Sequence, residues 1–202
     1  MEDDKIKDDR SHNRENILRC ATRLFYAKGY DAVGVQEIAE AAGITKPTLY
    51  YYFKSKYGLL ESLLESKLSI LNREIGNAAG QPGDITVILN RVAMVYLTTA
   101  EGDREFYFLM LALFYSARDN EAYQAIKPYL LEQFDIVKRI FERESGQLGN
   151  MHGRQEQFAI GFSGIINHYI LVFYERNREE KGLADINTAY SLVHQFMHGI
   201  FS

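Results

Sequence analysis

The spacing of apolar residues constrains the fold of this chain more than any other feature. Apolar side chains recur at intervals of three and four, as in Ile17, Ala21, Leu24 and Phe25, and no long alternating stretch interrupts the pattern. This is the period of a helix that buries one face. Prolines, which interrupt helices, number only three. The sequence therefore predicts an all-α protein of about nine helices.

The chain of 202 residues is long enough for one large domain or two smaller ones. Its single cysteine, Cys20, cannot form an internal disulfide, which is typical of a reducing cytosol. Residues 1–10 are a charged run without an apolar stretch, which predicts a disordered acidic tail and no signal peptide. The longest apolar run, Phe106 to Tyr115, has ten residues, whereas about 20 are needed to cross a bilayer. We therefore expect no membrane partner.

The charges are unevenly distributed along the chain. The net charge is -4, yet residues 10–60 carry eight Lys and Arg against four Asp and Glu. The charge distribution matters more than the total when a nucleic-acid partner is considered. A basic block beside an acidic remainder is the pattern expected when one module alone faces phosphates.

Within this basic block, residues 36–56 have the pattern of two short helices joined by a tight glycine turn. Ala39 and Ala42 allow the helices to cross closely, Gly43 makes the turn, and Thr45 is suited to cap the second helix. This arrangement predicts a helix-turn-helix with Thr45–Phe53 as the recognition helix. A pair of short helices without a DNA partner could carry the same pattern. However, a helix cannot turn Tyr50, Tyr51 and Tyr52 all inward, so at least one large aromatic side chain is exposed without a structural need.

The outward side chains of the second helix suit contacts with DNA. Lys46 can donate to guanine, and the Pro47 ring and Thr48 methyl can pack on thymine methyl groups. Tyrosine hydroxyls and Lys56 suit phosphate oxygens. Gln36, at the start of the preceding helix, can reach a phosphate or a base edge.

The residues of this block resemble the TetR family of bacterial repressors in order and spacing. The matching positions are Phe25, Gly29, Tyr30, Ile38-Ala39, Ala42-Gly43-Ile44, Leu49-Tyr50-Tyr51, Phe53-Lys54-Ser55-Lys56 and Leu59-Leu60. The resemblance implies base-facing positions for Lys46, Pro47, Thr48 and Tyr50. It implies phosphate-facing positions for Tyr51, Tyr52 and Lys56. The family often has His where Tyr52 stands, so Tyr52 is expected either at a phosphate or in the core.

The sequence suggests three segments: a tail (1–10), a helix-turn-helix DNA-binding domain (11–60), and a remainder (61–202) with a break at Gly76–Gly83. The resemblance implies that the remainder is a helical ligand-binding and dimerisation domain whose last two helices pair with their copies. A twofold dimer would read two half-sites. The candidate dimer residues form two apolar stripes, which could alternatively be the core of a single chain. They are Phe158, Ile165, Ile166, Tyr169, Phe173, Tyr190, Val193, Phe196, Met197 and Ile200.

A set of aromatic and methionine residues between these regions could line a pocket for an apolar or aromatic ligand. Ordinary core packing is the alternative for each member. The candidate pocket residues are Tyr96, Phe106, Met110, Phe114, Tyr115, Tyr123, Phe134, Phe162 and Asn167.

The sequence contains no Gly-rich phosphate loop, no nucleophile elbow and no paired acidic motif, so we expect neither an enzyme nor a cofactor. His194 and His198 have a spacing that can hold zinc, but no third ligand stands near them, and no metal is expected. Our hypothesis is a cytoplasmic, homodimeric repressor that binds a palindromic double-stranded DNA operator and is released by a small apolar or aromatic molecule. The alternatives are an activator of the same fold, and a helical binding protein or enzyme that has kept the fold.

Overall fold

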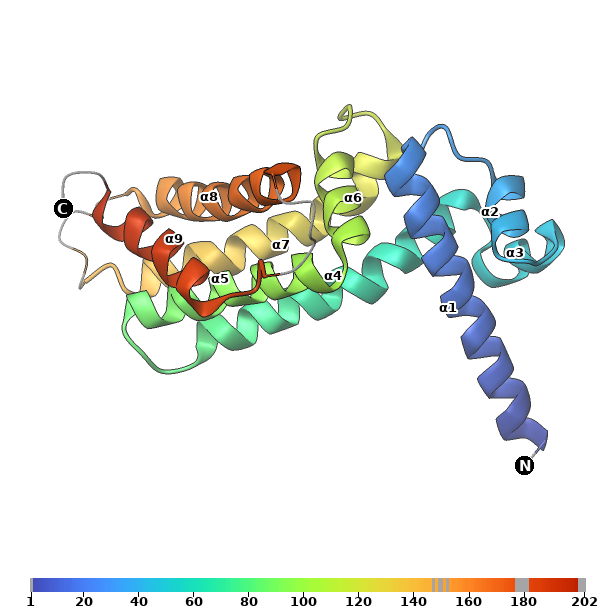
Figure 1. Ribbon diagram of the computed structural model, residues 1–202, viewed down its shortest axis with the longest axis horizontal. Coiled ribbons are helices and arrows are strands. Elements are labelled where there is room, and N and C mark those ends of the chain that lie inside the picture. Colours follow the sequence, from blue (N-terminus) through green and yellow to red (C-terminus); the bar gives the residue numbers. More distant parts are fainter. Residues whose placement is uncertain (1, 147, 149–150, 152, 177–181, 200–202) are drawn as a thin grey trace. The chain divides into compact units, whose positions relative to one another are not determined.

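The computed structural model describes residues 2–146, 148, 151, 153–176 and 182–199, with residues 2–11 described by their backbone alone (Figure 1). Within these ranges the chain forms nine α-helices and no β-strand. The helices are α1 (Glu2–Lys28), α2 (Val35–Ala41), α3 (Lys46–Phe53), α4 (Lys56–Gly80), α5 (Ile85–Gly102), α6 (Arg104–Phe114), α7 (Glu121–Arg143), α8 (Gln155–Arg176) and α9 (Ile186–His198). The predicted all-α class is confirmed.

Local signals in the sequence mark many of the helix boundaries. The Thr45 hydroxyl accepts a hydrogen bond from the backbone N–H of Thr48 at 3.3 Å, and Asp84 accepts one from Val87 at 3.0 Å. These bonds satisfy N–H groups that have no partner within the first turn of a helix. Gly29 and Gly43 end α1 and α2 in left-handed conformations, with φ of 80° and 68°. The predicted cap at Thr45 and the predicted turn at Gly43 are confirmed.

Two boundaries differ from the prediction. Helix α1 begins at Glu2, so residues 2–10 are helical rather than a disordered tail. Helix α4 continues to Gly80, so the predicted break at Gly76–Gly83 shrinks to the few residues before Asp84.

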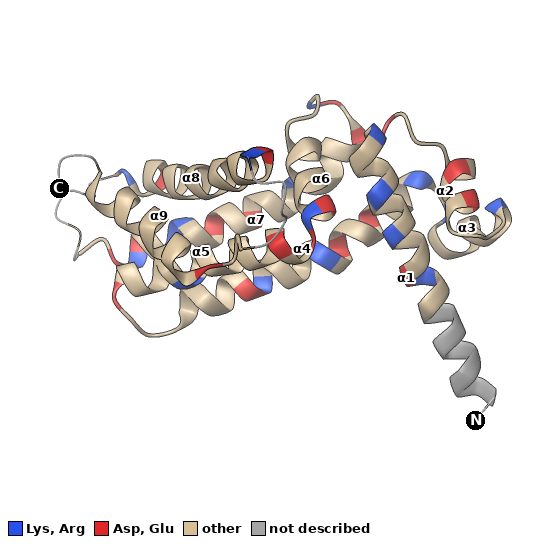
Figure 2. Ribbon diagram, viewed as in Figure 1, with Lys and Arg blue, Asp and Glu red and all other residues tan. Residues whose placement is uncertain are grey.

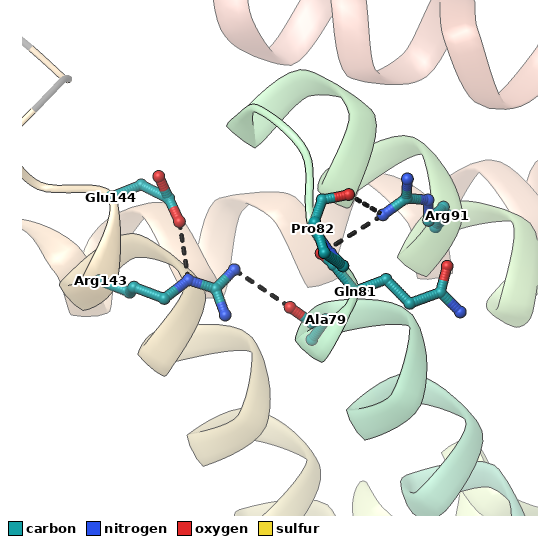
Figure 3. Close-up of polar contacts among 6 residues, drawn as sticks. All are labelled: Ala79, Gln81, Pro82, Arg91, Arg143 and Glu144. Atoms are coloured by element: carbon teal, nitrogen blue, oxygen red, sulfur yellow. Dashed lines mark hydrogen bonds and ion pairs between the residues drawn. The ribbon is translucent and has the colours of Figure 1, made fainter.

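An arginine of α7 supports the extended end of α4, and an arginine of α5 supports the turn that follows it (Figure 3). Arg143 of α7 donates to the carbonyl of Ala79 at 3.0 Å and to the Glu144 carboxylate at 2.7 Å. Arg91 of α5 donates to the carbonyl of Pro82 at 2.9 Å. The last carbonyls of a helix lack partners within it, and cationic donors there also complement the helix dipole. These bonds stabilise a glycine-containing stretch that is a weak helix former by itself.

The chain divides into two compact units. The first unit comprises residues 1–67 and 105–128, and the second comprises residues 68–104 and 129–202. The DNA-binding domain predicted for residues 11–60 therefore packs with α6 and the start of α7, both of which lie in the predicted remainder (61–202). A ring contact between Tyr26 and Phe108, with centroids 6.3 Å apart, is one of the interactions that join these segments in the first unit.

In the first unit, the predicted inward faces of α1, α2 and α3 form the core. Ile17, Phe25, Ile38 and Leu49 are at most 1% exposed, so they fix the three helices against one another. Cys20 is also buried and donates to the carbonyl of Ala41 at 3.4 Å, as a small core residue would. Burial of these side chains supplies the main driving force for folding of the unit.

In the second unit, α5 packs against α8 and α9, and α8 packs against α9. Phe141 lies at the centre of an aromatic cluster, with the rings of Phe158, Phe162 and Phe196 at 6.0, 6.4 and 6.0 Å from its own. The contacts with Phe162 and Phe196 are edge-to-face, a geometry that adds to the stabilisation that burial alone provides. The cluster joins α7, α8 and α9.

Candidate nucleic-acid interface

Helices α2 and α3 form the predicted helix-turn-helix. Ile44 N donates to the carbonyl of Ala39 at 3.0 Å across the glycine turn. Leu49 and Phe53 are 0% and 3% exposed, so one face of α3 is buried against the rest of the unit. The opposite face is left to solvent, as a helix that enters the major groove requires.

The predicted base-contacting side chains lie on this outward face of α3. Lys46, Pro47 and Tyr50 are exposed, and Thr48 is half-buried. The Lys46 ammonium is 5.8 Å from the centre of the Tyr50 ring, so the two form one surface of a cation beside an aromatic ring. Thr48 shares a hydrogen bond of 2.8 Å with the hydroxyl of Thr45, which leaves its methyl group as the portion free for apolar contact.

The remaining predicted DNA contacts differ in exposure. Tyr51 is 62% exposed, the highest value on α3 among its large apolar and aromatic side chains. Tyr52 is half-buried, with its ring against both Tyr51 and Phe53 at 5.4 and 6.0 Å. Its environment is therefore intermediate between a phosphate contact and a core position, the two alternatives that the sequence leaves open for Tyr52. Gln36 is exposed at the start of α2 and donates to Glu40 at 2.7 Å.

Lys56 has protein partners that the sequence does not reveal. Its ammonium donates to the carbonyls of Tyr30 and Val33 at 2.9 and 3.1 Å and lies 3.5 Å from that of Asp31. It also stands 4.2 Å from the centre of the Tyr30 ring. Lys56 thus links the first turn of α4 to the loop between α1 and α2. The predicted phosphate contact competes with these bonds.

The turn between α3 and α4 is tight and strained. Lys54 has φ of 65° and ψ of -38°, and Ser55 N donates to the carbonyl of Phe53 at 2.7 Å across it. This is a γ-turn of the rare type with positive φ, a conformation costly for any residue with a side chain. A Cβ atom on Gly58 would overlap the Phe53 carbonyl oxygen, so this close approach requires glycine. Lys54 is exposed at the tip of the turn.

Basic and acidic residues both occur in the helices of the first unit (Figure 2). Lys28 forms an ion pair with Glu37, which ties the end of α1 to α2. Arg14 stands 5.5 Å above the Phe53 ring. Lys46 and Lys54, by contrast, are exposed at the two ends of α3.

The predicted pocket residues divide between the two units, so a common pocket stays a prediction. Phe106, Met110, Phe114, Tyr115 and Tyr123 belong to the first unit, and the other four belong to the second. Of the nine, Tyr96, Phe106, Met110 and Phe162 are at most 2% exposed, which is core packing, whereas Tyr115 is 79% exposed.

A different part of the second unit contains a groove that none of the predicted pocket residues lines. It is an open groove of about 740 Å³ between the end of α4, α5 and α9. Ala78, Met94, Val95 and Ala189 contribute apolar surface, and Asn77 and Asn90 contribute amides. No pattern in the sequence indicated this groove, because its walls come from three separate segments.

The predicted dimer stripes lie partly inside the chain. Ile166 and Val193 are each 1% exposed, so these two predicted interface residues are instead core residues facing the chain's own interior. Phe158, Ile165, Tyr169, Phe173, Phe196 and Met197 are half-buried. Tyr190 is 58% exposed, and Ile200 lies outside the described residues.

The outward faces of α8 and α9 carry other residues. Ile160 on α8 is 57% exposed, with Gly164 and His168 following at helical spacing. On α9 the rings of Tyr190, His194 and His198 form a ladder, with centroids 5.9 and 4.5 Å apart. Helix α8 is long and apolar enough to cross a membrane by length and composition, although a core helix passes the same test. In the described part of the chain, no three metal-ligating side chains come together.

Comparison with known proteins agrees with this geometry. Residues 17–63 match the sequence model of the family described as bacterial regulatory proteins, tetR family. The transcriptional regulator AcrR of Shigella flexneri is 29% identical over 67% of this chain, and the alignment spans 65% of its own length. The uncharacterized regulator YvkB of Bacillus subtilis is 31% identical, over 78% of this chain and 80% of its own.

A solved structure extends the likeness to nearly the whole chain. The transcriptional regulator FadR from Bacillus subtilis, in complex with stearoyl-CoA, has a TM-score of 0.74 and covers 92% of this chain and 98% of its own at 19% identity. The fold and the site define a helix-turn-helix DNA-binding regulator. The chain belongs to the TetR family of transcriptional regulators.

Proposed function

We propose that the chain is a cytoplasmic transcriptional repressor that binds a near-palindromic operator as a homodimer and releases it on binding a small, largely apolar molecule. The exposed outward face of α3 carries the DNA-binding part of this proposal. Lys46, Pro47, Tyr50 and Tyr51 face solvent there, while Leu49 and Phe53 hold the opposite face in the core. Large aromatic side chains left exposed on an anchored helix favour a partner surface.

Two recognition helices are expected because one helix gives weak binding, and a twofold dimer reads two half-sites one helical turn apart. The outward faces of α8 and α9 are the candidate interface. Ile160 and Tyr190 are exposed on them, and Gly164 leaves room for a close approach. Only 28% of the apolar stretch of α8 is buried within one chain.

The candidate ligand site is the apolar groove between the end of α4, α5 and α9. Its volume of about 740 Å³ falls within the range of pockets that hold small molecules. FadR from Bacillus subtilis was solved with stearoyl-CoA, whose acyl chain is apolar, and this supports a ligand with a large apolar part for this fold. A ligand shifts DNA occupancy only if it binds the DNA-free state more tightly than the DNA-bound state.

The DNA-binding proposal is tested by gel-shift titration of the full chain against the region upstream of its own gene. A salt-sensitive, sequence-selective complex is expected. Lys46→Ala should relax the sequence preference, because a lysine that donates to guanine discriminates between bases. Lys138→Ala is the control, since Lys138 forms an ion pair with Glu142 on α7. Absence of a selective complex with the intact dimer would refute the proposal.

The dimer is tested by sedimentation. Ile160→Asp should place a charge in the apolar interface and yield monomers, which should also lose DNA affinity. Leu131→Asp is the matched control, because Leu131 is 50% exposed on α7, a helix outside the proposed interface. An Ile160→Asp protein that remains dimeric would exclude this face as the interface.

A further inference from the structure

The two lysines that flank Ser55 are similar in sequence and different in structure. Lys54 is exposed at the tip of the strained turn after α3, and Lys56 is half-buried in the first turn of α4. We propose that Lys54 supplies the phosphate contact at this end of the recognition helix, and that Lys56 is a positioning residue that does not touch DNA. This inference rests on the proposed function, since it assigns roles within the same DNA interface.

The hydrogen-bond donors of the Lys56 ammonium already have partners within the protein. An ammonium group has three N–H donors. The carbonyls of Tyr30, Asp31 and Val33 surround the group at 2.9, 3.5 and 3.1 Å. The Tyr30 ring adds a cation–π contact at 4.2 Å. To reach a phosphate, Lys56 would have to give up these bonds. The carbonyls of Asp31 and Val33 would then lose this donor, while that of Tyr30 would keep the backbone N–H of Val33 at 3.3 Å.

These bonds position the recognition helix. Lys56 follows α3 closely, and the loop it holds leads directly into α2 at Val35. The ammonium therefore ties the segment after the recognition helix to the segment before its supporting helix. Loss of this link is expected to loosen the orientation of α3. The basic side chains that face the DNA, such as Lys54, keep their charge.

Lys54 has the opposite environment. Its ammonium lies 3.4 Å from the carbonyl of Tyr51 and 6.0 Å from the Tyr51 ring, both at the exposed end of α3. A single hydrogen bond leaves donors for a phosphate oxygen. Tyr51, itself 62% exposed, shares this edge, so the pair forms a cationic and aromatic surface suited to the DNA backbone.

The test is the salt dependence of DNA affinity for the full-length wild type, Lys54→Met and Lys56→Met, with Lys138→Met as control. The probe is a duplex selected by the wild type from a random pool, titrated between about 50 and 200 mM salt. Lys54→Met should lower the slope of log K against log salt by about 0.9 for each phosphate that the protein no longer neutralises. Lys56→Met should lower affinity by the same factor at every salt concentration, with the wild-type slope. Methionine keeps an apolar stem against the Tyr30 ring.

A reduced slope for Lys56→Met, or an unchanged slope for Lys54→Met, would overturn the assignment. A second measurement avoids dependence on the fold of the variants: ¹⁵Nζ NMR of the wild-type ammonium groups, assigned by single Lys→Arg variants. The Lys54 signal should shift on addition of the duplex, whereas the Lys56 signal should stay in place. The reverse pattern would refute the inference. If the wild type selects no duplex at all, the proposed function fails first, which is a distinct result.

Discussion

Tyr30 donates its phenolic hydrogen to the carboxylate of Glu121, a residue 91 positions further along the chain. A second hydrogen bond joins the same two segments: the Asn120 amide donates to the Asp31 carboxylate at 2.7 Å. The loop between α1 and α2 is therefore held by the start of α7 as well as by Lys56. All of these residues belong to the first unit.

Tyr30→Phe should lower the free energy of unfolding by about 1 kcal/mol, the usual contribution of one hydrogen bond. The loss is modest because Glu121 is exposed and water replaces the lost hydroxyl. Chemical denaturation measures it. Tyr26→Phe is the control, since Tyr26 is 38% exposed and keeps its ring contact with Phe108. Equal effects of the two substitutions would contradict a specific contribution from the bond to Glu121.

Gly58→Ala should be more damaging than its size suggests. The added methyl group would overlap the carbonyl oxygen of Phe53, a backbone atom that cannot turn aside. We expect a loss of about 1–3 kcal/mol, as in other overpacked sites. Gly76→Ala in the same helix is the control, because a Cβ there meets nothing within 4 Å. A Gly58→Ala protein as stable as Gly76→Ala would show that the turn can relax.

Thr45→Ala removes the side-chain cap of the recognition helix and the hydroxyl partner of Thr48. The expected cost is about 1 kcal/mol in denaturant unfolding. Thr45→Ser keeps the hydroxyl and should retain most of the wild-type stability. If serine and alanine destabilise alike, the methyl group of Thr45 rather than its cap bond is what matters.

Alkaline pH should destabilise the folded chain through its buried tyrosines. Burial raises the pKa of Tyr96 and of Tyr30 well above the ordinary value of 10.0, and the bond to Glu121 raises that of Tyr30 further. Below pH 10 these groups are protonated in both states, so their contribution to stability is fully present. Above pH 10 they ionise in the unfolded chain first, and stability is lost as the pH rises toward the folded-state pKa values.

Each such tyrosine adds up to about 1.4 kcal/mol per pH unit to the slope with which the free energy of unfolding falls. Tyr96→Phe should therefore flatten the decline measured by denaturation between about pH 10 and 11, within the window given by the unfolded-state pKa. Tyr115→Phe is the control, because Tyr115 is 79% exposed. A decline that is as steep in Tyr96→Phe as in the wild type would argue against ionisation of Tyr96 as a cause.

Features governed by local chemistry could be predicted from the sequence. The cap by Thr45 and the left-handed Gly29 and Gly43 depend on a few adjacent residues, and the buried Leu49 and Phe53 follow from helical spacing. The same reasoning identified the outward face of α3. These predictions needed no knowledge of distant segments.

Features that depend on distant residues could not be predicted in this way. The glycines near the end of α4 predicted a break, but Arg143 of α7 supports the helix through the carbonyl of Ala79. The charge of Lys56 suggested a phosphate partner, although the carbonyls around it come from residues more than 20 positions earlier. Ile166 and Val193 have the spacing of an interface stripe, yet only tertiary packing decides which side of a helix is inward.

The strained turn at Lys54 also has a consequence for folding stability. Glycine would adopt a φ of 65° at much lower cost, so every copy of this protein forgoes some folding stability by carrying a lysine there. A residue that lowers stability is retained when its side chain is needed for function, such as DNA binding. In directed evolution for heat resistance, position 54 is accordingly where glycine should arise early, in lineages that no longer need to bind DNA.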